Sequence, residues 1–102
     1  MSVLSVTSEA FEKEVINSDK PVLVDFYADW CGPCRMMSSV IDEISDERSD
    51  IKVCKINVDE QCGLAERFSV QSIPTIMVFK NGSVTRCEAG SRPKRAVLEM
   101  LD

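Results

Sequence analysis

The chain has 102 residues, of which 44% are hydrophobic and 28% are charged, and its net charge is −5. This length and composition predict one folded domain over residues 1–102, with a single core and no linker. An acidic chain without a basic run is a poor candidate for binding nucleic acid or an anionic membrane surface. Because histidine is absent, imidazole catalysis and most catalytic zinc sites are excluded.

The sequence carries no recognisable membrane segment or export signal. No apolar run approaches the roughly 18 residues that span a bilayer. The segment Met1–Val6 has neither the basic start nor the long apolar stretch of a secretory signal. These patterns predict a cytoplasmic protein without a membrane anchor.

The first third of the chain predicts a strand, a helix and a second strand. Val3–Val6 has the pattern of a short strand, and Thr7 or Ser8 is expected to cap a helix that ends within residues 17–21. The apolar run over residues 22–27 is nearly continuous, which is typical of a strand covered on both faces.

The middle of the chain predicts two further helices around a strand. A helix is expected from the segment Cys31–Cys34 to about Arg48, with four apolar residues at helical spacing facing the core: Met37, Val40, Ile41 and Ile44. Residues 51–58 predict a strand, and residues 60–68 predict a short helix.

The last third predicts a hairpin and a final helix. Thr75–Lys80 reads as a strand, and Asn81-Gly82 predicts a two-residue turn into a partner strand over residues 84–89. Gly90 and Ser91 are expected to cap a helix with Pro93 in its first turn. Since helical crossovers make parallel strands and short turns make antiparallel pairs, we expect an α/β fold: a mixed sheet with helices on both faces.

Five cysteines in a short chain are the first chemical signal, and Cys31 and Cys34 form its single C-x-x-C pair. Without a second close pair, a structural zinc site is disfavoured. A helix that opens at this pair would bring the two sulfurs within bonding reach, and its amino terminus would favour a thiolate. Cys31 is expected to be the more exposed and more acidic thiol, with Gly32 permitting the turn. The pattern predicts thiol–disulfide exchange.

The sequence resembles the thioredoxin family across almost its whole length. The matching segments are Val24-Asp25-Phe26, Trp30-Cys31-Gly32-Pro33-Cys34, Ile73-Pro74-Thr75, Phe79-Lys80-Asn81-Gly82 and Gly90. The resemblance implies the thioredoxin-like fold, Cys31 as the attacking nucleophile and Cys34 as the resolving thiol. It also implies a cis peptide bond before Pro74.

Asp25 is the one charged residue in its apolar strand. Burial would raise the pKa of this carboxyl, and the resemblance implies that it shuttles a proton to and from Cys34. The alternative role for Asp25 is a salt bridge with Lys55, which also lies among apolar residues. The two roles are compatible. Lys55 is expected to be a catalytic residue together with Cys31, Cys34 and Asp25.

The resemblance further implies a flat, largely apolar surface that docks protein disulfides around Cys31. Its expected residues are Trp30, Gly32, Pro33, Ile73, Pro74 and Gly90. The alternative for Trp30 and Ile73 is a purely structural place in the core.

Three cysteines lie outside the motif. Cys54 alternates with apolar residues and is expected to be a buried small hydrophobe, Cys62 is expected near a helix start, and Cys87 on an edge strand. The sequence also departs from common family positions. Ser39 stands where many members have a proline, and Tyr27 where many bacterial members have a tryptophan.

Together these observations predict a monomeric protein disulfide reductase that binds no cofactor and no metal. The resemblance implies disulfide-containing client proteins and a thioredoxin reductase, most simply a flavin-containing one, as electron donor. Two alternatives remain at this point: a disulfide oxidase or isomerase, and a redox-silent binding module. Gly-Pro between the cysteines resembles the reducing members of the family.

Overall fold

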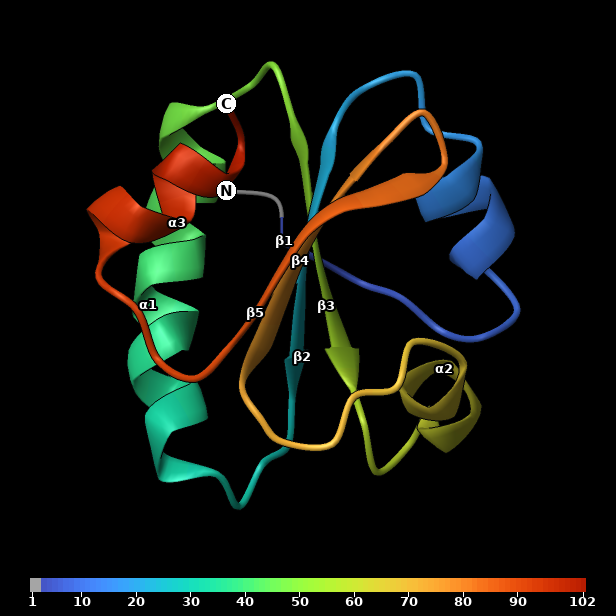
Figure 1. Cartoon of the computed structure of the whole chain (residues 1–102), viewed down its shortest axis with the longest axis vertical. Coiled ribbons are helices and arrows are strands. Elements are labelled where there is room, and N and C mark those ends of the chain that lie inside the picture. Colours follow the sequence, from blue (N-terminus) through green and yellow to red (C-terminus); the bar gives the residue numbers. More distant parts are fainter. Residues whose placement is uncertain (1–2) are drawn as a thin grey trace.

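The computed structural model describes residues 3–102 and shows a five-stranded sheet at the centre of the molecule (Figure 1). Met1, which begins the segment examined for an export signal, lies outside the described residues. The spatial order of the strands is β1-β3-β2-β4-β5. Their bounds are β1 Val3–Ser5, β2 Val22–Tyr27, β3 Lys52–Asn57, β4 Thr75–Lys80 and β5 Ser83–Ala89.

Helices cover both faces of this sheet. In Figure 1, α1 and α3 lie on one side of the strands, and η1 and α2 lie on the other. The bounds are η1 Glu12–Ile16, α1 Gly32–Glu47, α2 Cys62–Arg67 and α3 Lys94–Met100. The chain therefore has the predicted element order and the predicted α/β architecture, a mixed sheet between two helical layers.

The sheet is mixed, with parallel pairs among β1, β3 and β2 and antiparallel pairs among β2, β4 and β5. β3 pairs in parallel with β1 and β2, and the chain connects β1 to β2 through η1 and β2 to β3 through α1, whereas β4 pairs antiparallel with β2 and β5. The predicted hairpin turn is confirmed: Asn81 and Gly82 both have positive φ values, 54° and 80°. Two successive positive φ values are the requirement of the tight turn that suits twisted strands.

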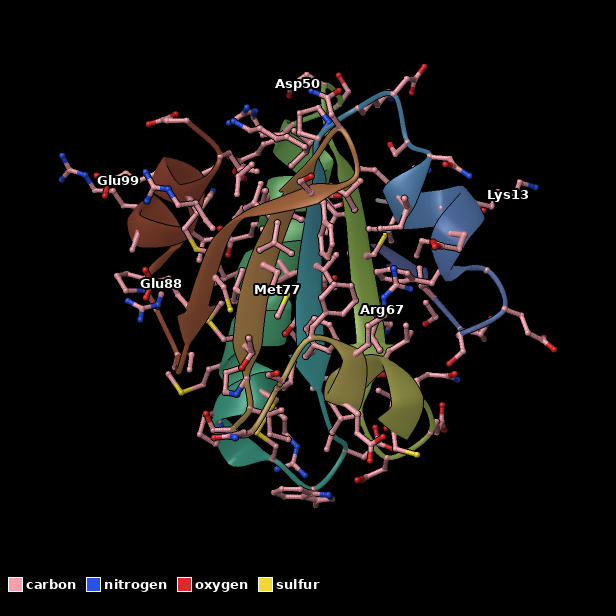
Figure 2. The ribbon with its side chains drawn as sticks, turned by 45° about the vertical axis from the view of Figure 1, so that its right-hand side comes forward. Lys13, Asp50, Arg67, Met77, Glu88 and Glu99 are labelled. Carbon is pink, nitrogen blue, oxygen red and sulfur yellow. A yellow bond between two sulfur atoms is a disulfide. The ribbon has the colours of Figure 1, made fainter. Side chains whose placement is uncertain are left out.

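Within residues 3–102 the sheet separates two large apolar clusters, one on each face, instead of the single core that the composition suggested, and a third, small cluster lies at the disulfide. The cluster under η1 and α2 contains three fully buried phenylalanines, Phe11, Phe26 and Phe79, and also Met77 (labelled in Figure 2). The cluster under α1 and α3 is built from aliphatic side chains. Met37, Ile41 and Ile44 are buried as their helical spacing predicted, while Val40 is only partly buried.

Two predicted helix starts differ from the structure. Thr7 does accept a hydrogen bond from the Ala10 N–H (3.3 Å), but the regular segment is a five-residue π-helix that begins at Glu12. Ser8 makes no such bond: its backbone N–H (2.9 Å) and its hydroxyl (3.1 Å) both donate to Gln61 Oε1. At the last helix, Pro93 occupies the N-cap position and makes no side-chain capping bond, so Ser91 lies outside the helix.

Candidate functional site

Cys31 and Cys34 lie at the junction between β2 and α1. The connection between these two elements is at the lower end of the sheet in Figure 1. Cys31 is the N-cap residue of α1, and its extended backbone (φ −89°, ψ 112°) turns the chain into the helix. The two residues form a disulfide with their Cα atoms 5.3 Å apart. The Cys34 N–H also donates a hydrogen bond to Cys31 Sγ (3.2 Å), which satisfies one of the free N–H groups of the helix terminus.

The expected difference in exposure between the two cysteines is not observed. Cys31 is 4% exposed and Cys34 is 3% exposed. Both sulfurs pack in a small cluster with Ala28, against which the partly buried Ile73 also lies. Cys31 Sγ is 3.9 Å from the Ile73 carbonyl oxygen. Because the loop before β4 folds over the pair, position at the end of a helix does not by itself give exposure.

Gly32 and Pro33 form the first turn of α1. Gly32 permits this turn, as expected, but the turn does not require a glycine: a Cβ added at Gly32 would meet no atom within 4 Å, and its φ is outside the left-handed region. The missing side chain instead leaves open space beside the disulfide. Pro33 suits the turn because the first N–H groups of a helix have no partner within it.

The loop before β4 brings a second segment to the disulfide. The Ile73–Pro74 peptide bond is cis, which confirms what the resemblance implied. The Pro74 carbonyl accepts a hydrogen bond from the Gly90 N–H (2.7 Å), so this loop is joined to the end of β5. Gly90 has a φ of +98°, a conformation that side chains rarely adopt. Pro74 and Gly90 are therefore brought together near the pair, although they are 16 positions apart in the sequence.

Trp30 lies on the surface beside Cys31. Its side chain is 69% exposed, so the alternative of a core position does not hold for it, whereas Ile73 is only partly exposed. The indole N–H donates to Asp59 Oδ2 (2.9 Å) in the loop after β3. This bond fixes the ring in place although most of its area faces solvent. Asp59 carried no local signal, because it lies 29 residues from Trp30 in the chain.

Asp25 is buried in β2 with 4% of its surface exposed, and its Oδ1 atom has no hydrogen-bond partner. Burial raises the pKa of this carboxyl from 3.8 to about 7; Lys55 lowers the pKa and Asp42 of α1 raises it. Asp25 projects from the same face of β2 as Leu23, which belongs to the cluster beneath α1. The carboxyl therefore lies on the sheet face that is covered by the helix carrying Cys34.

Lys55 is the neighbour of Asp25 on the adjacent parallel strand. Within residues 3–102 no ion pair at 4 Å or less joins the two side chains, so the predicted direct salt bridge is absent there. Lys55 Nζ instead lies 5.9 Å from the centre of the Tyr27 ring. The Lys55 charge acts on Asp25 through space and opposes, without cancelling, the rise of the Asp25 pKa that burial causes.

The three remaining cysteines occupy different environments. Cys54 is fully buried, as predicted, and burial raises the pKa of its thiol to about 12. Cys62 is exposed at the start of α2, and Cys87 is exposed on the edge strand β5. Partial burial and the neighbouring Glu88 raise the pKa of the Cys87 thiol. In the described part of the chain, no group of three or more Cys, Asp or Glu side chains is placed to hold a metal ion.

A methionine at this end of the molecule was missed by the sequence reasoning. Met36 is 69% exposed, as much as Trp30, and lies two residues after Cys34. A signal was available, because Met37 faces the core and its helical neighbour must then point elsewhere.

None of the helices within residues 3–102 combines the length and the apolar character of a membrane-spanning segment.

Comparison with known proteins agrees with the geometry. The family model "Thioredoxin" matches residues 2–102. The chain is 50% identical to a thioredoxin of Pyropia yezoensis, over 100% of this chain and 96% of the relative. It is 46% identical to a thioredoxin of Rickettsia felis, over 96% and 94% of the two chains. Thioredoxin 1 of Synechococcus elongatus is 47% identical, over 100% and 97%.

These matches cover the whole of the disulfide site, and Cys31 and Cys34 are joined in the disulfide that dithiol–disulfide exchange forms. The protein is a thiol–disulfide oxidoreductase of the kind that acts on protein disulfides and is reduced by a thioredoxin reductase. The chain belongs to the thioredoxin family.

Proposed function

We propose that this chain is a general reductant of protein disulfides in which Cys31 attacks and Cys34 resolves. The Cys31 thiolate attacks one sulfur of the client disulfide and releases the other as a thiolate. The Cys34 thiolate then attacks Cys31 Sγ, releases the second client thiolate and leaves the Cys31–Cys34 disulfide. The client gains two electrons and the cysteine pair loses two, which a reductase then returns.

The observation that carries this assignment is the place of Cys31 at the terminus of α1. The Cys34 N–H that now points at Cys31 Sγ (3.2 Å) would also donate to a thiolate at that sulfur. The partial positive charge of the helix terminus acts in the same direction. Both effects favour Cys31 as the nucleophile and as the better leaving group in the reverse reaction.

Asp25 is the proposed proton acceptor for the Cys34 thiol. Its pKa of about 7 lets the carboxyl gain or lose a proton near neutral pH, which a carboxyl at its ordinary pKa could not do. The unpartnered Oδ1 atom is available for a proton. Lys55 would tune this group by lowering its pKa from the neighbouring strand.

The client is proposed to dock on a shallow surface around the disulfide. Exposed Trp30 forms one side, and the backbone of the joined Ile73–Pro74 and Gly90 segments forms the other, because Pro74 itself is buried. The open space over Gly32 lets another backbone approach the sulfurs. The full set is Trp30, Gly32, Pro33, Ile73, Pro74 and Gly90, with the backbone of Ile73 pairing with an extended client segment.

The remaining proposals concern the state of the protein. We place it in the cytoplasm as a monomer with one domain over residues 1–102. A flavin-containing thioredoxin reductase is the proposed electron donor. Neither a bound cofactor nor nucleic acid has a part in this cycle, since the electrons are held in the cysteine pair itself.

The reduction potential of the pair tests the proposed direction of electron flow. Trp30 is the only tryptophan and adjoins Cys31, so its fluorescence reports the redox state. Titration of this signal against thiol–disulfide buffers should give a potential below that of the glutathione pool. For a two-electron couple, about 30 mV corresponds to about 1.4 kcal/mol. A clearly more oxidising value would instead make the protein a disulfide oxidase or isomerase.

The roles of the individual residues require a kinetic test. A variant without both thiols, C31S/C34S, should lose client reduction completely. Biological activity that survives this substitution would favour a redox-silent binding module. Single-turnover rates for Asp25→Asn should show a slower second step and an unchanged first attack, and an unchanged second step would remove Asp25 from the mechanism.

A further inference from the structure

Exposed apolar side chains are concentrated beside the disulfide. Among residues 3–102, four large hydrophobic side chains are exposed, and the two most exposed, Trp30 and Met36, are each 69% exposed. The other two, Leu4 and Val84, are 40% and 42% exposed and lie on the edge strands β1 and β5. Trp30 directly precedes Cys31 and Met36 follows Cys34 by two residues, so the two flank the reacting pair in the sequence. Of these two side chains, only Trp30 belongs to the docking surface proposed above.

Met36 borders a groove of about 330 Å³ between α1 and the chain that leads to α3. In Figure 1 this chain, after β5, passes beside α1. The groove is lined by Met36, Met37, Val40, Ser91, Arg92 and Pro93. We call it the Met36 groove. Its size suits one apolar side chain, and an unbranched methionine on its wall can adapt to side chains of different shape.

Hydrogen bonds connect the two sides of the Met36 groove, which are α1 and the loop before α3. The Arg92 N–H donates a hydrogen bond to Met37 Sδ (3.3 Å) and thereby joins the loop to α1. The Arg92 guanidinium donates to the Ala89 carbonyl (3.2 Å) and to Glu88 Oε1 (2.9 Å), so the loop is also held against β5. Figure 2 labels Glu88 at this side of the sheet. The groove therefore exists before any partner arrives.

The Met36 groove continues the surface that surrounds the disulfide. Ser91, on its wall, follows Gly90, whose N–H is bonded to the Pro74 carbonyl (2.7 Å). The residue before Pro74, Ile73, has its carbonyl 3.9 Å from Cys31 Sγ. An extended chain that lies along this loop and presents a cysteine to Cys31 is thus led toward Ser91 and the groove.

We propose that the Met36 groove is a second client subsite, which receives an apolar side chain close in sequence to the cysteine that Cys31 attacks. This inference rests on the proposed reduction of client disulfides. The occupant is a client polypeptide with leucine, methionine or phenylalanine at that place, and the client is held on both sides of the reacting sulfurs, by Trp30 and by the groove. Clients with a charged or small residue there bind more weakly, because they leave the apolar walls in water.

A set of synthetic peptides tests this subsite. Each peptide carries one cysteine in a mixed disulfide with glutathione within a glycine–serine background, and a leucine stands at one of the three positions before or after it. Single-turnover reduction by the reduced protein is followed through Trp30 fluorescence. We expect leucine at one position to raise the second-order rate about tenfold over the peptide without leucine.

Three variants make the result specific. In Met36→Asp the leucine preference should fall to about onefold, whereas Met36→Leu should retain it. Val84→Asp is the matched control, because it places the same charge at an exposed apolar residue of another surface, and it should keep the tenfold preference. A preference that no leucine position produces, that survives Met36→Asp, or that is lost equally in Val84→Asp would overturn the proposal.

Two further readouts separate the possible failures. Reduction of the leucine-free peptide by the wild-type protein tests the proposed function alone, so the subsite can fail while that function stands. NMR titration with the unreactive serine analogue of the best leucine peptide should shift the amide signals of Val40 and Arg92 in the wild-type protein. Shifts confined to residues outside the Met36 groove would contradict the subsite even if a variant had lost its fold.

Discussion

The two faces of the sheet are built for different tasks. The face beneath η1 and α2 is packed with aromatic rings, and the Phe68 ring lies 5.3 Å from that of Phe79 in an edge-on arrangement. Arg67 (labelled in Figure 2) lies over this group, with its guanidinium 5.2 Å from the Phe11 ring. The opposite face holds the buried carboxyl of Asp25, whose Oδ1 has no hydrogen-bond partner, under the helix that begins at the redox pair.

This difference shows how a small domain can hold a chemical site and remain folded. Burying a polar group without a hydrogen bond costs free energy. The burial of aromatic rings on the first face stabilises the fold and partly offsets the free-energy cost of burying Asp25 on the second face. Substitutions on the first face should therefore lower stability and leave redox chemistry intact, whereas substitution of Asp25 should have the opposite pair of effects.

The largest effect on stability is expected from the aromatic face. Phe79→Ala removes a ring that is 1% exposed and contacts both Phe11 and Phe68. We expect the free energy of unfolding to fall by about 3–5 kcal/mol, from lost burial and the cavity that remains. Urea denaturation would measure the fall. The reduction potential of the folded fraction should not move, and a shifted potential would mean that the two faces are not independent.

The next effect has the opposite sign and depends on pH. In Asp25→Asn the unfolding free energy at pH 8 should rise by about 2–4 kcal/mol, since one unit of pKa difference is about 1.4 kcal/mol. The folded protein holds the Asp25 proton up to about pH 7, whereas the unfolded chain releases it near 3.8. Wild-type stability therefore falls as pH rises between these two values.

The pH series provides the control for this prediction. Asparagine does not titrate, so the difference between the two proteins should be close to zero below pH 4 and constant above pH 8. Urea denaturation of both proteins across this range would show it. A difference that is the same at every pH would mean that packing, and not the buried charge, separates Asp25 from Asn.

A substitution of intermediate size compares a neutral buried group with Asp25. Cys54 is fully buried on the aromatic face, and Cys54→Ser would place a hydroxyl there. We expect a loss of about 1–3 kcal/mol in the unfolding free energy, because the new hydroxyl must be desolvated. Cys54→Ala serves as the matched variant without a hydroxyl, and an equal or larger loss in alanine would show that volume decides.

The smallest effect is expected from Lys55. Lys55→Met removes the charge that lowers the Asp25 pKa, so this pKa should move above about 7. The pH at which the stability of the protein stops falling should rise with this pKa. The accompanying change in the unfolding free energy should be less than about 1 kcal/mol, because Lys55 is partly exposed. Carbon-detected NMR titration of the carboxyl would measure the pKa directly, and a downward movement would contradict the assigned role of Lys55.

Much of the fold was predictable because its signals are local. The apolar run of β2, the Asn81-Gly82 turn and the helical spacing of Met37, Ile41 and Ile44 each act within a few residues. The positions of the redox pair and of buried Asp25 followed from the same patterns. The cis bond before Pro74 is different: the residues alone favour trans, and only the resemblance to a family indicated cis.

Long-range packing decided the rest. Position in the chain indicated an exposed Cys31, but the loop that carries Ile73 covers it from 42 residues away. The bond from Ser8 to Gln61, 53 residues distant, is also a contact that no local pattern could indicate. The Met36 groove likewise needs the Arg92 loop to meet α1. The sequence thus determined the chemistry at Cys31 and Cys34, while contacts between distant segments decided which surfaces border it, because a surface is formed by residues that only folding brings together.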